Sequence, residues 1–163
     1  MNEEVRDKIV ELALEQLGKE YVHGKNGSDT FDCAGLVYYV YKRVMGINLY
    51  EDGIGLSTTG KIMTNGKGNI VTFDEKSIDK DIDFIKKGDI LFLHRQALKE
   101  YETTEYNKYP GHCAIYLGNR KFIHATRLSG TVVINDLDDI IDPTKRKPKK
   151  WKKILVGYKN MID

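Results

Sequence analysis

Three side chains of this sequence have the chemistry of a nucleophilic catalyst: the thiol of Cys33 and the imidazoles of His112 and His124. A thiol that attacks a carbonyl group needs a general base within hydrogen-bond reach, and the base needs a third polar group to orient it. One cysteine and two histidines can supply the nucleophile, the base and the orienting group. Each of these residue types is by itself more often a core or surface residue than a catalyst. The helix and strands that carry the three side chains must therefore show whether they can meet in one site.

Cys33 lies at the predicted start of a helix. Asp32 is a preferred N-cap residue, and the apolar positions after it recur at helical spacing to about Met45, before a stop at Gly46. The first turn of a helix has unpaired N–H groups and the positive end of the helix dipole, and both favour an anion. The sequence therefore predicts that the pKa of Cys33 lies below the ordinary thiol value of about 8.5.

The two histidines lie on two strands that we expect to be neighbours. Residues 113–117 and 121–126 are apolar runs separated by the turn residues 118–120, a pattern typical of a β-hairpin. His112 opens the first strand, and His124 lies on its partner. If the helix that carries Cys33 packs across this sheet, the three groups line up as thiolate, imidazole and imidazole.

The other periodic segments predict an α+β domain. Residues 3–17 form a predicted helix that stops at Gly18, with an apolar face that includes Val5, Ile9, Leu12, Ala13 and Leu17. Further strands are expected at residues 90–94, 132–135 and 155–159. Helices followed by strands favour a layer of helices on an antiparallel sheet.

Three segments between these elements have weaker patterns. Residues 20–30 are rich in Gly, Asn, Ser and Asp, so we expect a loop that leads to the cysteine helix. Residues 48–83 predict an irregular connection with one short helix near residues 58–63. Residues 95–110 form a polar insertion before the first histidine strand.

Length and composition exclude several classes of protein. The 163 residues fit one domain, 1–163, that can bury a core. A net charge of +2 gives no argument for nucleic-acid binding, and two cysteines make no disulfide framework, so free thiols are the default and one bridge stays open. No apolar run approaches the roughly 20 residues of a membrane span.

The charged N-terminus predicts no secretory signal peptide. The location therefore stays open: the cytoplasm, export by another route, delivery by a phage or mobile element, or a secreted protein trimmed of its leader.

Three ordered motifs resemble those of the NlpC/P60 cysteine peptidases. Residues 31–37, F-D-C-A-G-L-V, resemble the family's D-C-[SA]-G-[LF]-V motif. Residues 111–119, G-H-C-A-I-Y-L-G-N, are similar to its second motif, usually close to G-H-V-G-I-Y-L-G-N. Residues 121–125 resemble the third, a histidine followed by a small residue. With weaker matches elsewhere, the resemblance runs from about residue 18 to 158.

The resemblance implies a papain-like α+β fold with the nucleophile helix packed on an antiparallel sheet. It implies that Cys33 is the nucleophile, His112 the general base and His124 the orienting residue. The implied reaction is hydrolysis of peptide stems of bacterial peptidoglycan, commonly at a γ-D-glutamyl–diamino acid bond, without metal or cofactor. In the substrate site, Asp32 would contact a free amine of the stem, and Tyr21 would help to hold the oxyanion or the peptide.

The sequence departs from the family pattern at four places. Ala34 replaces the commoner serine, which removes a hydroxyl group from a predicted substrate-binding position. Ala114 replaces glycine beside the base, and Cys113 replaces valine, with its side chain expected on the buried face opposite His112. The insertion at residues 95–110 would wall one side of the site. None of these changes removes a catalytic group.

Other functions use the same residues. The same relay would serve an acyltransferase, an amidase or a deamidase acting on another substrate. A metal site built from Cys33, Cys113, His112 and His124 is disfavoured, because adjacent strand residues point to opposite faces. An inactive wall-binding module would be expected to lack one of the three catalytic residues.

A basic segment lies near the C-terminus. Residues 145–153 contain seven lysines and arginines. Such a run is usually a solvated loop, and its functional alternative is contact with an anionic wall polymer.

Overall fold

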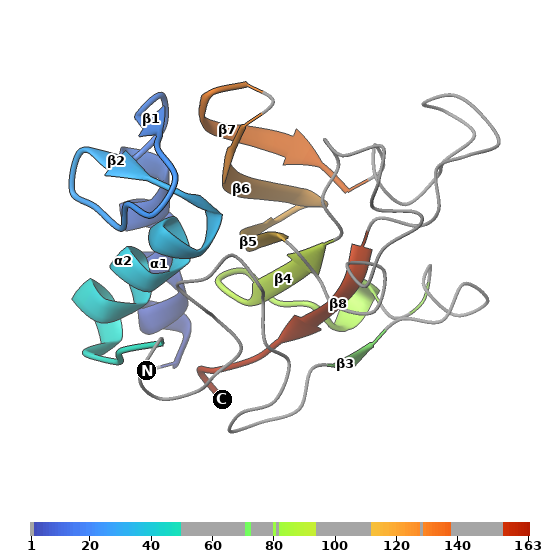
Figure 1. Cartoon of the computed structure of the whole chain (residues 1–163). Coiled ribbons are helices and arrows are strands. Elements are labelled where there is room, and N and C mark those ends of the chain that lie inside the picture. Colours follow the sequence, from blue (N-terminus) through green and yellow to red (C-terminus); the bar gives the residue numbers. More distant parts are fainter. Residues whose placement is uncertain are drawn as a thin grey trace, which may run out of the picture.

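The computed structural model (Figure 1) describes residues 2–49, 71–72, 80, 82–93, 112–127, 129–137 and 155–163. Helix α1 spans Asn2–Glu15, helix α2 spans Cys33–Met45, and a short 3-10 helix, η1, spans Ile82–Phe84. The strands in these ranges are β1 Glu20–Tyr21, β2 Thr30–Phe31, β3 Val71–Thr72, β4 Ile90–Leu93, β5 His112–Gly118, β6 Lys121–Thr126, β7 Thr131–Asp136 and β8 Leu155–Lys159.

The eight strands of the described ranges form one sheet in the order β2-β1-β7-β6-β5-β4-β8-β3. Only the β1–β2 pair is parallel, so the predicted antiparallel sheet is confirmed. The β5–β6 hairpin turns through Asn119 and Arg120, with φ of 51° and 62°. Positive φ at both central residues is the turn whose twist matches that of the flanking strands.

The predicted helices are confirmed, with one difference at an end. Helix α2 begins after Asp32, with extended backbone (φ −92°, ψ −175°), and ends at Gly46 in the left-handed region (φ 72°). Helix α1 ends at Glu15, earlier than predicted, and the chain then turns through Gly18 at φ 82°. Leu17 is therefore 44% exposed and does not belong to the apolar face.

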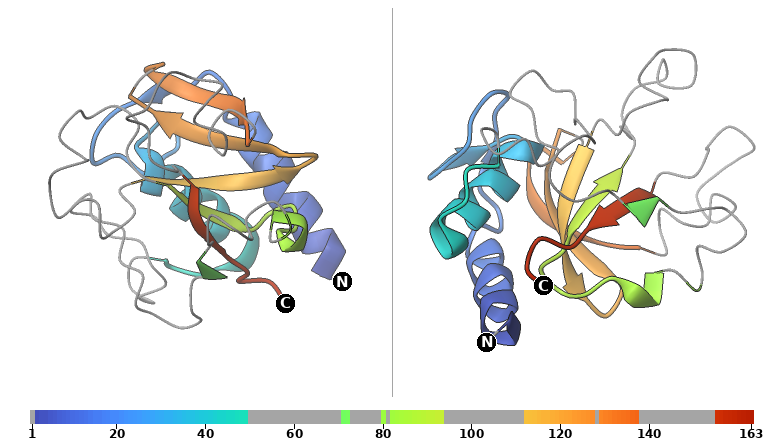
Figure 2. Two further views of the ribbon diagram at one scale, coloured as in Figure 1. Left: turned by 90° about the vertical axis from the view of Figure 1, so that its right-hand side faces the viewer. Right: turned by 90° about the horizontal axis from the view of Figure 1, so that it is seen from below.

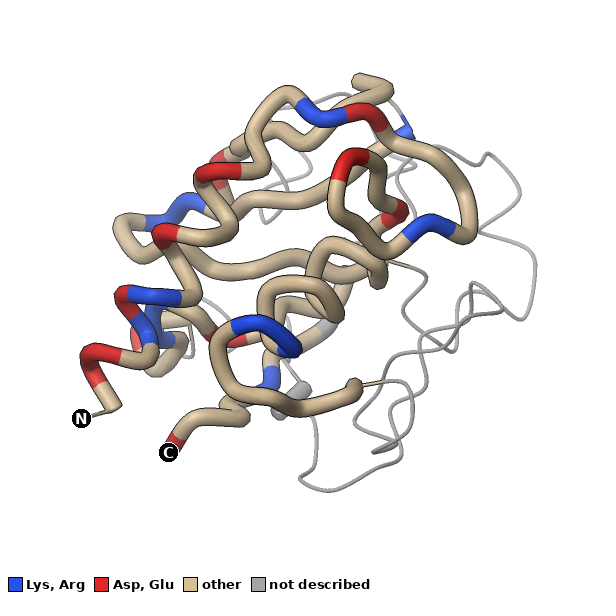
Figure 3. The backbone as a smooth tube through the Cα atoms, turned by 90° about the vertical axis from the view of Figure 1, so that its left-hand side faces the viewer, with Lys and Arg blue, Asp and Glu red and all other residues tan. Residues whose placement is uncertain are grey.

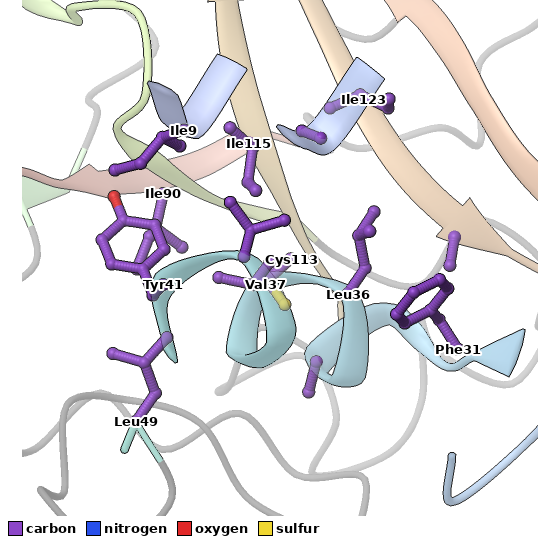
Figure 4. Close-up of a cluster of buried hydrophobic side chains, with 14 of the residues drawn as sticks. Ile9, Phe31, Leu36, Val37, Tyr41, Leu49, Ile90, Cys113, Ile115 and Ile123 are labelled. Atoms are coloured by element: carbon purple, nitrogen blue, oxygen red, sulfur yellow. The ribbon is translucent and has the colours of Figure 1, made fainter. Parts of the chain in front are cut away.

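Two apolar clusters lie on opposite faces of the curved sheet. The first packs both helices against the sheet (Figures 2 and 4) and includes Ile9, Phe31, Leu36, Val37, Val40, Tyr41, Ile90, Cys113, Ile115 and Ile123. The second, on the other face, includes Ile82, Leu91, Leu93, Ala114, Tyr116, Phe122, Leu137 and Leu155. Burial of both faces fixes the strand register, because a shift of one residue would exchange the faces.

Arg6 connects the N-terminal helix to a buried carboxylate and to the C-terminal end of the chain. The Arg6 guanidinium, 2% exposed, lies 2.8 Å from Oδ1 of Asp89, which has no exposed surface. The same guanidinium donates to the Lys87 carbonyl at 2.8 Å, to Asn160 at 3.0 Å and to Asp163 at 2.9 Å. These contacts hold α1, the turn before β4 and the C-terminal residues together, and Figures 1 and 2 show the two termini side by side.

Acidic and basic positions both occur along α1, as Figure 3 shows. Of these residues, Arg6 is buried in the ion pair with Asp89. Among the described residues, no helix is long and apolar enough to cross a membrane.

Three predictions concern residues outside the described ranges. They are the short helix near residues 58–63, the insertion at residues 95–110 and the anionic-polymer contact of residues 145–153, and all three stay predictions.

The buried ion pair predicts a large effect on stability. Replacing Arg6 with leucine leaves the Asp89 carboxylate buried without its counter-charge, so we expect the free energy of unfolding to fall by about 3 kcal/mol. Urea unfolding measures this change. The control is Lys86→Met, which removes an ammonium group that is 60% exposed and also contacts Asp163. Its effect should be much smaller, because exposed pairs contribute little; equal losses would contradict a special role for Arg6.

Candidate active site

The carboxylate of Asp32 positions Cys33 at the first turn of α2. Its Oδ1 accepts from the backbone N–H of Gly35 at 2.6 Å, and its Oδ2 accepts from the N–H of Gly24 at 3.0 Å. Position 35 must be glycine, because a Cβ there would collide with the carbonyl oxygen of Lys25 in the preceding loop. The loop, the cap and the cysteine are therefore fixed as one unit.

Two hydrogen bonds connect His112, His124 and Asn135 across three strands. Nε2 of His112 lies 2.7 Å from Nδ1 of His124, and Nε2 of His124 lies 2.7 Å from Oδ1 of Asn135. The β5–β6 ladder begins only at Ile115 and Ile123, so His112 meets His124 beyond the end of that ladder. The rings pack edge to face with their centroids 4.9 Å apart.

The direction of these bonds follows from the amide oxygen. Oδ1 of Asn135 can only accept, so Nε2 of His124 carries the proton and its Nδ1 is an acceptor. Nε2 of His112 then donates to that acceptor, which leaves Nδ1 of His112 as the nitrogen that can meet a sulfur. The second histidine and the asparagine thus set the tautomer and orientation of the first.

His124 works as a neutral group. Its side chain is only 2% exposed. Burial, with a further contribution from the neighbouring charge of His112, lowers the pKa of His124 to about 3, against the weaker opposing effect of the Asn135 hydrogen bond. It therefore accepts a hydrogen bond from His112 at neutral pH without competing for the positive charge.

Two residues of β5 influence the ionisation of Cys33. Hydrogen bonding by the Cys113 thiol is the largest cause, and with the His112 imidazole and the backbone N–H of Cys113 it outweighs burial and lowers the pKa of Cys33 well below its ordinary value. Burial raises the pKa of Cys113, and the adjacent charge of Cys33 raises it further. The stable arrangement is a thiolate at position 33 beside a protonated thiol at position 113.

The structure joins His112 and His124 by a hydrogen bond, and His112 is one of the groups that lower the pKa of Cys33, so the catalytic roles of the three residues stay a prediction. Cys113 has no exposed surface and packs in the helix-facing cluster, on the predicted buried face. Figure 4 shows it between β5 and α2.

The charge of Cys33 influences the ionisation of both Tyr21 and Asp32, whereas Ala34 is buried. Burial, followed by the charge of Cys33, raises the pKa of Tyr21, so its phenol is a protonated donor. Burial also raises the pKa of Asp32, in spite of its two backbone hydrogen bonds. Ala34 is 4% exposed and packs in the helix-facing cluster, which leaves its methyl group little surface to offer a substrate.

Two further residues at the site have no motif that marks them. Asn135 lies on the predicted strand at residues 132–135, and only the pairing of Phe122 with Asn135 in the β6–β7 ladder places it next to His124. Arg127 lies in the turn between β6 and β7, and its guanidinium is 5.8 Å from the centre of the Tyr21 ring.

Within the described ranges, no group of three His, Cys, Asp or Glu residues is arranged to hold a metal ion.

Comparison with known proteins finds two endopeptidases of Escherichia coli among the relatives of this chain. The probable endopeptidase YafL of Escherichia coli is 28% identical over 134 residues, covering 79% of this chain and 44% of the relative. The murein DD-endopeptidase MepH of the same organism is 28% identical over 150 residues, covering 91% of this chain and 43% of the relative. The chain therefore spans less than half the length of these relatives.

Structural comparison gives the same fold. The structure of NlpC1 from Trichomonas vaginalis matches with a TM-score of 0.63 at 22% identity, covering 96% of this chain and 44% of that one. The NlpC/P60 family model matches residues 18–141, which include the cysteine, both histidines and the asparagine. On these grounds the chain belongs to the NlpC/P60 family.

Proposed function

We propose that this chain is a cysteine peptidase that hydrolyses peptide stems of bacterial peptidoglycan at a γ-D-glutamyl–diamino acid bond. The observation that carries the proposal is the hydrogen-bonded chain from His112 through His124 to Asn135, beside a cysteine at a helix N-terminus. Membership of the NlpC/P60 family supports it, as do two relatives that are named as endopeptidases.

In the proposed reaction, the Cys33 thiolate attacks the amide carbonyl carbon and forms a tetrahedral oxyanion. Backbone N–H groups at the start of α2 and the protonated phenol of Tyr21 stabilise this oxyanion. His112 donates its proton to the leaving amine as the carbon–nitrogen bond breaks and a thioester remains. His112 then takes a proton from water, which attacks the thioester, releases the acid and regenerates the thiolate.

The charges beside the sulfur favour a substrate with a free amine. Cys33 and Asp32 bring two negative groups together, and the charge of Cys33 is one cause of the raised pKa of Asp32. Each Asp32 oxygen accepts one backbone hydrogen bond and keeps capacity for another. An ammonium group bound there would relieve the repulsion, which suits the amino end of a stem peptide.

The first prediction concerns the nucleophile. Cys33→Ala should lower the hydrolysis of purified muropeptides by at least about 10³-fold, because the oxyanion site alone retains little catalysis. Mass spectrometry of the products measures the loss and identifies the bond. A crosslinked muropeptide is included because one relative is named a DD-endopeptidase. Cleavage that survives the substitution rejects the mechanism, and a transferred acyl group in place of a free acid would indicate an acyltransferase.

The second prediction concerns the ionisation of Cys33. Because its pKa is lowered, the thiolate persists as the pH falls, so alkylation by iodoacetamide should have its midpoint below the value of about 8.5 for a free thiol. His112→Ala should move this midpoint upward. Mass spectrometry follows the labelling, and buried Cys113 provides an internal control that should stay unlabelled. A midpoint at or above the free-thiol value would contradict the assignment.

The third prediction concerns Asn135. Asn135→Leu removes the acceptor for Nε2 of His124, and the loss of about 1.5–3 kcal/mol should lower kcat by about 10–100-fold. KM should change little, because Asn135 is separated from the sulfur by both imidazoles. The matched variant Asn135→Asp keeps an acceptor oxygen and should retain more activity. If the two variants have equal kcat values, the asparagine has no role in orienting the relay.

A further inference from the structure

Arg127 presents an exposed guanidinium that no carboxylate neutralises. It lies over the Tyr21 ring, 5.8 Å from the ring centre. Among the described residues, Arg127 forms no ion pair with an aspartate or glutamate. Tyr21 is partly buried against the helix-facing cluster, whereas Arg127 is exposed. A guanidinium has five N–H donors, so contact with one tyrosine leaves donors for a carboxylate from solution.

Main-chain hydrogen bonds fix the positions of Tyr21 and the turn that carries Arg127. The N–H of Tyr21 donates to the Gly130 carbonyl at 2.8 Å, and the N–H of Gly130 donates to the Thr126 carbonyl at 2.9 Å. On its other side β1 pairs with β2, where Tyr21 lies opposite Phe31. Strand β1 therefore connects the turn after β6 to the segment that leads into α2.

These connections place Arg127 near the proposed nucleophile and relay. Tyr21 lies opposite the residue that comes two positions before Cys33, and both side chains pack against the helix-facing cluster. Arg127 follows His124 by three residues, which is about 10 Å along an extended strand, and an arginine side chain can cover much of this distance. The guanidinium can therefore reach a substrate that is held at Cys33.

We propose that Arg127 binds the α-carboxylate of the D-glutamyl residue whose carbonyl is attacked. This inference rests on the proposed function and deepens it. In a γ-linked glutamyl residue the side-chain carboxyl group forms the amide bond, so the α-carboxylate stays free a short distance from the scissile carbonyl. The arginine fork matches a carboxylate with two parallel N–H donors, whereas a carboxamide offers only one acceptor atom.

Arg127 and Asp32 then recognise opposite charges of one stem. Each Asp32 oxygen keeps capacity to accept a hydrogen bond from an ammonium group. A stem fragment that begins with a free amine and continues with a γ-linked glutamyl residue carries both an ammonium group and a carboxylate. It satisfies Asp32 and Arg127 in one orientation only, and this orientation decides which carbonyl group meets Cys33.

The experiment uses two synthetic peptides that differ in one group. One is L-alanyl-γ-D-glutamyl-lysine, and the other has a carboxamide in place of the α-carboxylate; each is also made with diaminopimelate in place of lysine. For wild type, kcat/KM should be at least about tenfold higher for the carboxylate peptide, mainly through KM, because the contact already exists in the bound substrate. Arg127→Gln should abolish this preference, and Arg127→Lys should keep part of it, since lysine keeps the charge without the fork.

Arg43 provides a matched control. It lies near the C-terminal end of α2, and its guanidinium is 5.5 Å from the centre of the Tyr39 ring. Arg43→Gln therefore makes the same chemical change in an arginine–tyrosine pair at the far end of the helix from Cys33, and the preference should stay at its wild-type value. Equal losses of preference in Arg43→Gln and Arg127→Gln would reduce the effect to net charge and overturn the carboxylate site.

Binding to an inactive variant separates the carboxylate site from the proposed function. In the Cys33→Ala background, calorimetry should give at least about tenfold tighter binding of the carboxylate peptide, and adding Arg127→Gln should remove the difference. Wild type that hydrolyses both peptides equally well, or prefers the carboxamide, would overturn the site while the proposed function stands. Wild type that hydrolyses neither peptide, with the binding difference intact, would reject the proposed function and support the site. Equal affinities, or no binding of either peptide, would overturn the site.

Discussion

The hydrogen bonds to the Asp32 carboxylate are the constraint on which the geometry of the site depends. One oxygen caps α2 through Gly35, and the other holds the preceding loop through Gly24. These bonds fix where the first turn of the helix begins, and therefore where the Cys33 sulfur lies relative to β5. The missing side chain at Gly35 belongs to the same constraint, because only glycine lets the loop approach the helix closely enough. A cap that most helices use for stability here also sets the position of Cys33, the proposed nucleophile.

The burial of His124 limits the positive charge at the site. If both histidines were protonated, two adjacent cations would face one thiolate, and the hydrogen bond between the rings would be lost. The burial of His124 prevents this, since the neutral ring is the form that the apolar surroundings tolerate. Asn135 fits the same requirement, because an uncharged acceptor directs the proton on His124 without favouring its ionisation as an aspartate would. The relay can therefore carry a single positive charge, at His112, next to the sulfur.

The sequence could predict those features that depend on residues close together in the chain. The cap at Asp32, the end of α2 at Gly46 and the strands around His112 and His124 depend on residues close in the chain, so local patterns revealed them. Motif resemblance added the pairing of the cysteine with the histidines. The burial of Arg6 and the place of Asn135 could not be read in this way, because each depends on a partner that only the tertiary fold brings near. Leu17 was misassigned because the apolar periodicity continues past Glu15, where α1 ends.

At position 113 the cysteine packs like the valine that is usual in the family motif, but it adds a thiol group. A free cysteine behaves as a small apolar side chain, so it fills the space of the valine that is usual in the family. The apolar surroundings that accept it also keep its thiol protonated, and a protonated thiol is what can donate to the Cys33 thiolate. Ala34, one residue after the nucleophile, lacks the hydroxyl of the commoner serine and is buried. Taken together, the two substitutions remove a polar group from the helix and add one on the sheet. The groups that lower the pKa of Cys33 therefore come from β5, the strand that also begins with His112.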